Sequence, residues 1–139
     1  MPSIRDFQPE DYNKLITLWQ ELGLGRPERG DDLEVIRETL RRGGKLLIME
    51  EKGQLVGTAW ITNNGRRLYL HHMGIREEMQ GKGHGKMLMK PVIDFAREQG
   101  MQIKLEVHEQ NPAARKLYEE FGFKELDGYR VLINRNVTK

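Results

Sequence analysis

The sequence predicts a mixed α/β protein of one domain, residues 1–139, with a mostly antiparallel central sheet of about six to seven strands and about four helices. Two observations carry this prediction. Apolar runs at 45–51, 54–62 and 66–75 are separated only by short turns, which is typical of three consecutive antiparallel strands. The run at 101–108 follows a helical segment, and a strand–helix–strand unit implies a parallel pair of strands.

The first third of the chain predicts one short strand, over residues 4–7, and two helices. The segment "QPEDYNKLITLWQELGL" carries apolar residues at i, i+3, i+4 and i+7, which form one face of a helix: Leu15, Leu18, Trp19 and Leu22. The segment "DDLEVIRETLRR" starts on acidic residues and stops at Gly43-Gly44, and these are the usual start and stop signals of a helix.

The segment after the three antiparallel strands predicts a crossover helix. Residues 86–100 have an apolar helical face and close at Gly100, a residue suited to the helix C-terminus. Pro91 lies inside this helix and should kink it, because proline removes one i→i−4 hydrogen bond.

The C-terminal part predicts one more helix and a hairpin. Asn111 and Pro112 supply an N-cap and a first helical residue, and the helix should run to about Phe121. The segments "FKEL" and "YRVLINRN" predict a closing hairpin around Asp127-Gly128.

Composition limits the classes of function. Hydrophobic residues make up 37% and charged residues 32% of the chain, and a net charge of +2 is too small for a nucleic-acid-binding stripe. The chain has no cysteine, which excludes a disulfide framework, a cysteine-ligated zinc site and a cysteine nucleophile. No apolar run approaches the roughly 18 residues of a membrane span, and the N-terminus lacks a signal-peptide apolar region. We therefore expect a cytoplasmic protein without nucleic-acid or membrane partners.

The stretch "MQGKGHGK" at residues 79–86 combines glycines with lysines and suggests a phosphate site. A Walker P-loop would need a glycine where Gln80 stands and a serine or threonine where Met87 stands. In the dinucleotide fingerprint, the third glycine would fall on Lys86 or Leu88. What remains is a glycine-rich turn between a strand and a helix N-terminus, whose N–H groups suit a pyrophosphate. A flexible turn that only caps a helix explains this stretch equally well.

The flanking residues favour the pyrophosphate site. The hexapeptide "QGKGHG" matches the pattern Q/R-x-x-G-x-G/A, and the segment "LEVHEQNPAARKLYEEFGF" follows after about 25 residues of helix and strand. The first segment resembles the acetyl-CoA signature of the GCN5-related N-acetyltransferase (GNAT) family. The second resembles that family's second motif and is similar to the ribosomal-protein N-terminal acetyltransferases. The resemblance implies an acetyl-CoA-dependent N-acetyltransferase with the GNAT fold.

The resemblance also implies where acetyl-CoA binds. Main-chain groups at the end of the strand before the signature would pair with pantetheine: Met73, Gly74 and Ile75. The turn and the last helix would complete the cofactor site through Gln80, Gly81, Lys82, Gly83, His84, Gly85, Lys86 and Asn111. A Cβ at position 83 or 85 would hold the phosphates away from the backbone. No metal is expected.

The spacing of Tyr118 alone favours ordinary core packing with Leu117 and Phe121. The resemblance reverses this preference and implies that Tyr118 is the acid that protonates the leaving thiolate. The base is left open. Glu106 stands where the ribosomal-protein acetyltransferases have a base, on a strand whose Leu105 and Val107 should point to the opposite face. One of His71 and His72 should face the cleft, and histidine titrates near neutral pH. Water could also relay the proton.

The acceptor is expected to be a primary amine of a small molecule or peptide. Without a cysteine to hold the acetyl group, direct attack in a ternary complex is favoured. Substrate choice should depend on the loop "GLGRPERGDD" and on residues 127–130. Two other functions are left open: a catalytically silent acyl-CoA-binding sensor or interaction module, and nucleic-acid binding through Lys82 and Lys86. A homodimer that pairs through the C-terminal hairpin is also left open.

Overall fold

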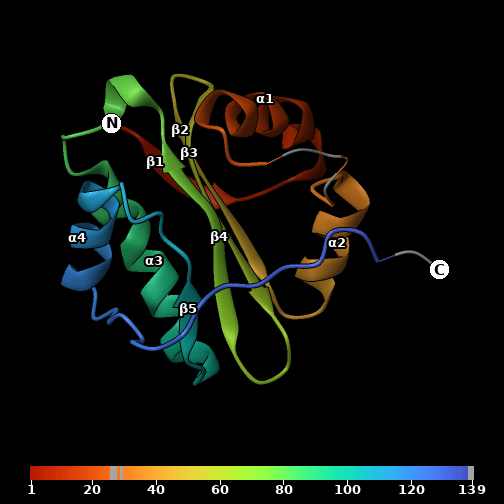
Figure 1. The fold of residues 1–139 in the computed structure, drawn as a ribbon. Helices are drawn as coiled ribbons and strands as arrows, with labels where there is room; N and C mark the ends of the chain where they lie inside the picture. Colours follow the sequence, from red (N-terminus) through yellow and green to blue (C-terminus); the bar gives the residue numbers. More distant parts are fainter. Residues whose placement is uncertain (26–27, 29, 138–139) are drawn as a thin grey trace.

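The computed structural model describes residues 1–25, 28 and 30–137. Over these residues the fold is one sheet with helices on both faces, as Figure 1 shows. The sheet has the order β1-β2-β3-β4-β5. Its strands are β1 (Ser3–Asp6), β2 (Lys45–Glu51), β3 (Gln54–Asn63), β4 (Leu68–Ile75) and β5 (Ile103–Leu105). The pairs from β1 to β4 are antiparallel and β4–β5 is parallel, which confirms the expected mixed sheet.

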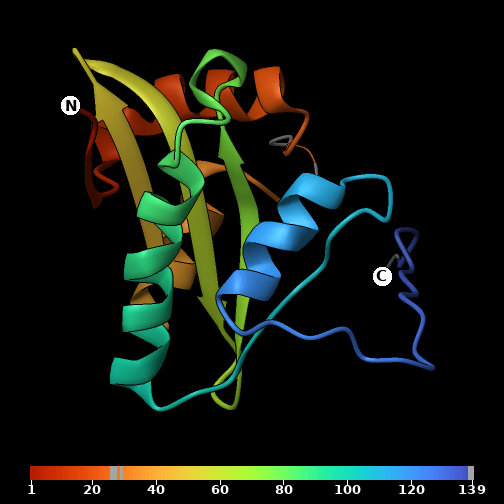
Figure 2. The same cartoon turned by 90° about the vertical axis from the view of Figure 1, so that its left-hand side faces the viewer.

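Two pairs of helices cover the two faces of the sheet. α1 (Tyr12–Leu22) and α2 (Leu33–Arg41) cover one face, and α3 (His84–Gln99) and α4 (Pro112–Glu120) cover the other (Figures 1 and 2). Two short 3₁₀ turns, η1 (Pro9–Asp11) and η3 (Glu77–Met79), precede α1 and α3. No helix in the described part of the chain is long and apolar enough to cross a bilayer.

Each face has its own core because strand residues alternate between the two sides. Leu46, Ile48 and Trp60 point to the α1–α2 side, while Leu47, Met49 and Ile61 point to the α3–α4 side. The predicted apolar face of α1 is confirmed, since Leu15, Leu18 and Trp19 are fully buried. Burial of this size supplies most of the free energy that holds the helices to the sheet.

A pair of stacked indoles fastens α1 to the sheet. The rings of Trp19 and Trp60 lie 5.4 Å apart at an interplanar angle of 17°. Each indole N–H donates a hydrogen bond to a threonine hydroxyl, from Trp19 to Thr58 at 3.2 Å and from Trp60 to Thr39 at 3.0 Å. A buried indole N–H needs a hydrogen-bond acceptor, so these two bonds fix the positions of both tryptophans on this side of the sheet.

Local signals define several boundaries. Lys52 and Gly53 form the two-residue β2–β3 turn with positive φ angles of 53° and 78°, as hairpins of this type require. Asp32 caps α2 by accepting a hydrogen bond from the Val35 N–H at 2.9 Å. α3 remains helical through Pro91, so the bond lost there does not end the helix.

The predicted C-terminal hairpin is wrong. Among the described residues beyond α4, none belongs to a strand, so the sheet has five strands instead of the expected six to seven. Figure 2 shows this segment as a coil set apart from the sheet. Its apolar side chains are largely exposed: Leu126, Tyr129, Val131, Leu132, Ile133 and Val137. An isolated two-stranded hairpin is marginal in water, so the alternating pattern alone is not enough without a packed face.

Candidate active site

The strands β4 and β5 separate at one end of the sheet. Their pairing covers only three positions and ends at Leu70↔Leu105, and β4 then continues to Ile75. The expected strand over 101–108 is thus shorter than predicted, and Glu106 follows it directly. On its other edge β4 still pairs with β3, through Gly74 and Ile75. Within the described residues, no strand pairs with the β5-facing edge of 71–75, where the resemblance places pantetheine.

The glycine-rich turn connects this free edge to the N-terminus of α3. Gly81 and Gly83 have φ angles of 76° and 84°, which side chains rarely adopt, and a Cβ at either would meet nothing within 4 Å. Gly83 is the N-cap of α3, a helix of 16 residues whose first N–H groups and dipole favour an anion. This shape agrees with a backbone cradle for phosphate.

Two side chains of the signature brace the turn from within. Gln80 donates a hydrogen bond from Nε2 to the carbonyl of Ile75 at 2.8 Å, which ties the turn to the end of β4. The His84 Nδ1 lies 2.8 Å from the carbonyl of Met79 and donates to it, so this ring also has a structural contact. Both residues therefore support the backbone of the predicted pyrophosphate site.

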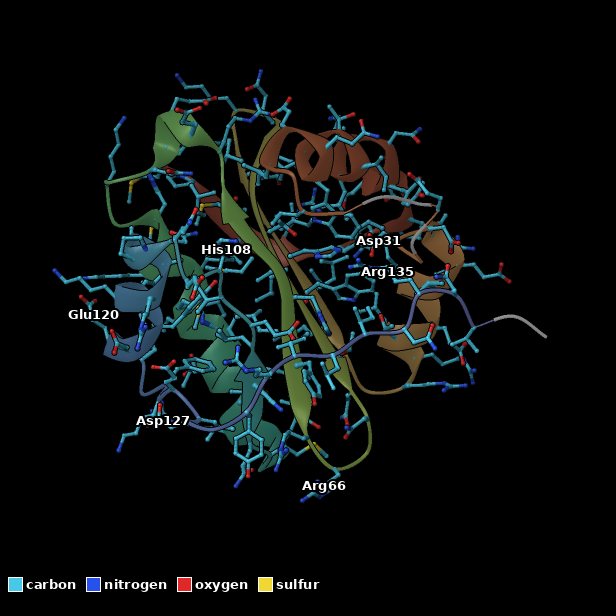
Figure 3. The ribbon with its side chains drawn as sticks, in the orientation of Figure 1. Asp31, Arg66, His108, Glu120, Asp127 and Arg135 are labelled. Carbon is cyan, nitrogen blue, oxygen red and sulfur yellow. The ribbon has the colours of Figure 1, made fainter. Side chains whose placement is uncertain are left out.

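The two signature lysines differ in their surroundings. Lys82 is exposed at the turn. Lys86 Nζ lies 3.2 Å from Glu120 Oε2 of α4, whose position at the outer side of the fold is visible in Figure 3. The charge of Lys86 is therefore partly engaged by α4, and Lys82 has the more open position.

The packing of α3 against α4 gives a further structural reason for a glycine at position 85. A Cβ at Gly85 would lie 3.0 Å from Leu117 Cδ2 of α4. Such a contact is tighter than ordinary packing, so the absence of a side chain lets α3 and α4 approach each other. The expectation that a Cβ at position 83 or 85 would hold the phosphates away from the backbone stays a prediction, and the open space beside Gly83 agrees with it.

The start of α4 agrees with the sequence prediction. Asn111 caps the helix, because its side-chain oxygen accepts a hydrogen bond from the Ala114 N–H at 3.2 Å, and Pro112 is the first helical residue. Its assignment to the cofactor site stays a prediction.

Tyr118 combines a buried ring with an available hydroxyl. It is 8% exposed, belongs to the α3–α4 core, and contacts Phe123 edge to face at 5.9 Å. Burial raises the pKa of the phenol above its usual value, so it stays protonated at neutral pH. Within the described part of the chain the hydroxyl makes no hydrogen bond, and it is not among the fully enclosed polar atoms. A protonated hydroxyl that no other described group engages can donate its proton to a leaving thiolate.

An irregularity in the β3–β4 pairing places both histidines beside Trp60. The register shifts between Thr58 and Trp60, and His72 has a positive φ of 46°. The rings of His71 and His72 lie 6.1 Å and 5.5 Å from the Trp60 ring. We expected strand alternation to send one histidine toward the cleft and the other away, and the bulge overrides this alternation.

His71 lies close enough to the other two candidate bases, His72 and Glu106, for their charges to affect its pKa. Its Nε2 lies 2.9 Å from the Thr62 hydroxyl, and burial, followed by the His72 charge, lowers its pKa. The carboxylates of Glu106 and Asp31 act in the opposite direction. Leu105 and Val107 pack against the core while Glu106 is exposed, which confirms their predicted alternation.

Asp31 was missed as a functional candidate. Its Oδ1 lies 3.0 Å from His72 Nε2, and Figure 3 shows Asp31 on the α1–α2 side of β4. It belongs to the loop expected to select substrate, of which residues 26, 27 and 29 lie outside the described residues. In the sequence, Asp31 is only an acidic residue in a loop, and nothing there predicts that it contacts His72. Among the described residues, no cluster of metal-ligating side chains occurs.

Comparisons with known proteins identify the family. Residues 6–123 match the model of the acetyltransferase (GNAT) family. A GNAT-family acetyltransferase from Staphylococcus aureus Mu50 is 22% identical and has a TM-score of 0.82, with 92% of this chain and 86% of that chain covered. A predicted acetyltransferase from Clostridium acetobutylicum, solved with acetyl-CoA, is 19% identical with a TM-score of 0.73, and 96% of each chain is covered.

A third similar structure is the ribosomal-protein-alanine N-acetyltransferase of Brucella melitensis biovar Abortus 2308. It is 22% identical with a TM-score of 0.70, and the match covers 95% of this chain and 99% of that chain. At these identities the three structures establish the likeness of the fold, and the family model extends over most of the sequence. The chain belongs to the acetyltransferase (GNAT) family.

Proposed function

We propose that this protein transfers the acetyl group of acetyl-CoA to a primary amine of a small molecule or peptide, by direct attack in a ternary complex. The observation that carries the proposal is the free edge of β4 beyond Leu70, which leads into the positive-φ turn at Gly81 and Gly83. An extended pantetheine can pair with such an edge, and a pyrophosphate suits the N–H groups at the start of α3.

The reaction needs a neutral amine. An alkylamine with a pKa near 10.4 lies about three units from neutrality at pH 7, which corresponds to about 4–5 kcal/mol. An N-terminal α-amine near pKa 8 needs only about 1.4 kcal/mol. A base at the end of β4 and β5 therefore contributes more for lysine-like acceptors. Glu106, His71 and His72 are the side chains near that point, and water is the remaining route.

In the proposed reaction, Tyr118 has a role separate from that of the base: it protonates the leaving thiolate. The amine nitrogen forms a bond to the thioester carbonyl carbon, the carbon–sulfur bond breaks, and the thiolate leaves with its electron pair. Tyr118 donates the phenol proton to that sulfur, and its raised pKa keeps the proton in place until then. The nitrogen releases one proton as the amide forms, and the tyrosinate recovers one from solvent, so the number of protons is unchanged.

The test is a CoA-thiol release assay with a panel of alkylamines and peptides with free N-termini. Release that depends on an acceptor supports the proposal. The intact mass of the protein after incubation with acetyl-CoA alone should show no added acetyl group, because direct attack forms no acetyl-enzyme. Binding of acetyl-CoA without release for any acceptor would indicate the sensor or interaction module. Salt-sensitive nucleic-acid binding that needs no CoA would indicate the third function.

A further inference from the structure

A carboxylate and an imidazole that are 41 residues apart in the sequence meet at the β4 bulge. Asp31 Oδ1 lies 3.0 Å from His72 Nε2, and their side chains are only 12% and 19% exposed. The backbone of Gly25 lies against this pair. A Cβ there would come within 2.6 Å of Asp31 Oδ2 and 2.7 Å of His72 Nε2. Gly25 therefore covers the contact from one side.

The imidazole of His72 is held from two further sides. Its ring lies 4.7 Å from Trp19 of α1 at 79° and 5.5 Å from Trp60 of β3 at 63°. The positive φ of His72 is a conformation that costs about 1–3 kcal/mol for a residue with a side chain. Strained residues of this kind concentrate at functional sites, and here the strain turns a second histidine to the same side as His71.

We propose that Asp31 is a positioning residue, which holds His72 in the tautomer with the proton on Nε2 and so leaves Nδ1 to accept the proton of the acceptor amine. The inference rests on the proposed function and adds a residue to it. A carboxylate only accepts hydrogen bonds, so the Nε2 that faces Asp31 carries the proton. Within the described chain, no hydrogen bond engages Nδ1 of His72.

The proton transfer balances without another reactant. The acceptor ammonium loses one proton to Nδ1 of His72, and the freed electron pair of its nitrogen attacks the thioester carbonyl. The nitrogen is cationic after the attack and releases its second proton to solvent as the carbon–sulfur bond breaks. The resulting imidazolium carries protons on both nitrogens, and Asp31 stabilises it through Nε2. Other titratable groups around this ring are His71, whose ring lies 6.4 Å away, and Glu106, whose charge reaches His71. Burial lowers the pKa of His71 and keeps it neutral, so it does not compete for the proton.

The first experiment reads the tautomer directly and needs no turnover. Nitrogen-15 NMR of the imidazoles distinguishes a protonated from an unprotonated ring nitrogen, and His72→Gln assigns the signal. His84, whose Nδ1 donates to a carbonyl, and His108, whose Nδ1 accepts from the Gln110 N–H, supply internal references for the two tautomers. We expect the Nε2–H form for His72 in the wild type and a mixture in Asp31→Asn. A wild-type His72 in the Nδ1–H form would overturn the proposal.

The second experiment compares Asp31→Asn with Asp32→Asn in steady-state kinetics. Asp32 is the matched control, because it removes the same charge one residue away and asparagine keeps the α2 N-cap. Asp31→Asn should lower kcat about 10²-fold at pH 7 and change KM for acetyl-CoA less than about twofold. The loss should shrink as the pH approaches the pKa of the acceptor, because solvent then supplies the neutral amine. Asp32→Asn should behave as the wild type.

The double variant Asp31→Asn/His72→Gln separates positioning from a general structural effect. If Asp31 acts through His72, the double variant should be no slower than His72→Gln alone. A loss that is equal at all pH values, or losses that multiply in the double variant, would overturn the proposal. A pH-dependent loss found only in Glu106→Gln would assign the base to Glu106 and also overturn it. If no acceptor reacts with the wild type, the proposed function fails while the NMR result still decides the Asp31–His72 pairing.

Discussion

Gly85 of α3 faces Leu117 of α4, and a Cβ on Gly85 would stand 3.0 Å from Leu117 Cδ2. Helix packing therefore gives a structural reason for Gly85. Gly83 has open space beside it and is explained by the positive φ angle that the turn requires. The two glycines should respond differently to substitution.

A larger side chain at position 85 should destabilise the fold. Gly85→Val should lower the free energy of unfolding by about 1–3 kcal/mol, because the added side chain would meet Leu117, which packs against the α3–α4 core. In the Gly85→Val background, Leu117→Ala should cost less than it does alone. Urea unfolding of the four proteins of this double-mutant cycle measures the coupling, and additive effects would show that the two side chains do not meet.

Acetyl-CoA should stabilise the protein through the turn at Gly83. At 100 times the dissociation constant the gain should be about 2.7 kcal/mol, measured as a shift in Tm. Gly83→Asp should abolish the shift, since a carboxylate repels the pyrophosphate. Gly83→Asn is the matched control, because both residues tolerate a positive φ and only one is charged. Equal Tm shifts with acetyl-CoA in both variants would show that the pyrophosphate does not bind beside position 83.

Removing the Tyr118 hydroxyl should slow turnover and leave binding intact. Tyr118→Phe should lower kcat about 10²-fold, with little change in acetyl-CoA affinity because the ring remains in the core. Since burial raises the phenol pKa, the wild-type acid stays protonated through neutral pH, and activity that depends on it should fall only above about pH 10. An unchanged kcat would leave Tyr118 with a packing role alone.

Glu106 should be dispensable as a base if His72 takes the proton. Glu106→Gln should then change kcat/KM by less than about threefold and keep the shape of its pH profile. His72→Gln should lose most activity at neutral pH and recover as the acceptor deprotonates in solution. The comparison requires one reactive amine from the panel. A pH-dependent loss in Glu106→Gln, with none in His72→Gln, would identify Glu106 as the base.

The Asp11–Arg5 pair should make stability depend on pH. Arg5 donates to both carboxylate oxygens of Asp11, at 2.7 Å and 2.8 Å, and these bonds are the main reason that the pKa of Asp11 is lowered. A carboxyl with a lowered folded pKa adds stability above its unfolded pKa and loses it as the pH falls through the folded value. Asp11→Asn should cost about 1–3 kcal/mol at pH 7, and the difference should narrow below about pH 4.

Asp6→Asn supplies the control for this pair. Asp6 also forms an ion pair, with Lys45 at 2.9 Å, but its side chain is mostly exposed. Exposed pairs contribute little, so its loss should be under about 1 kcal/mol. Urea unfolding at pH 7 and pH 3 measures both variants. A pH-independent cost of Asp11→Asn would contradict the assignment to its charge.

The sequence by itself determined the elements whose signals are local. The Lys52-Gly53 turn, the caps at Asp32 and Asn111 and the apolar face of α1 depend on residues within a few positions of one another, and all agree with the structure. The antiparallel run of β2, β3 and β4 and the presence of a parallel pair also follow from the lengths of the connections, whereas the pairing of β1 with β2 does not. The signature that indicated the family is likewise a contiguous stretch of chain.

Tertiary structure alone decided the features that depend on contacts between distant segments. The role of Gly85 required the position of α4, and the bulge that brings His71 and His72 to one side required the register of β3. The contact between Asp31 and His72 of β4 joins residues that are 41 positions apart and exists only in the folded chain. The C-terminal segment has strand-like alternation and forms no strand, because a strand needs a neighbour to pair with and a face to bury. Hydrophobic periodicity predicts the face of a helix or strand on which a residue lies, whereas tertiary packing determines which residues it contacts there.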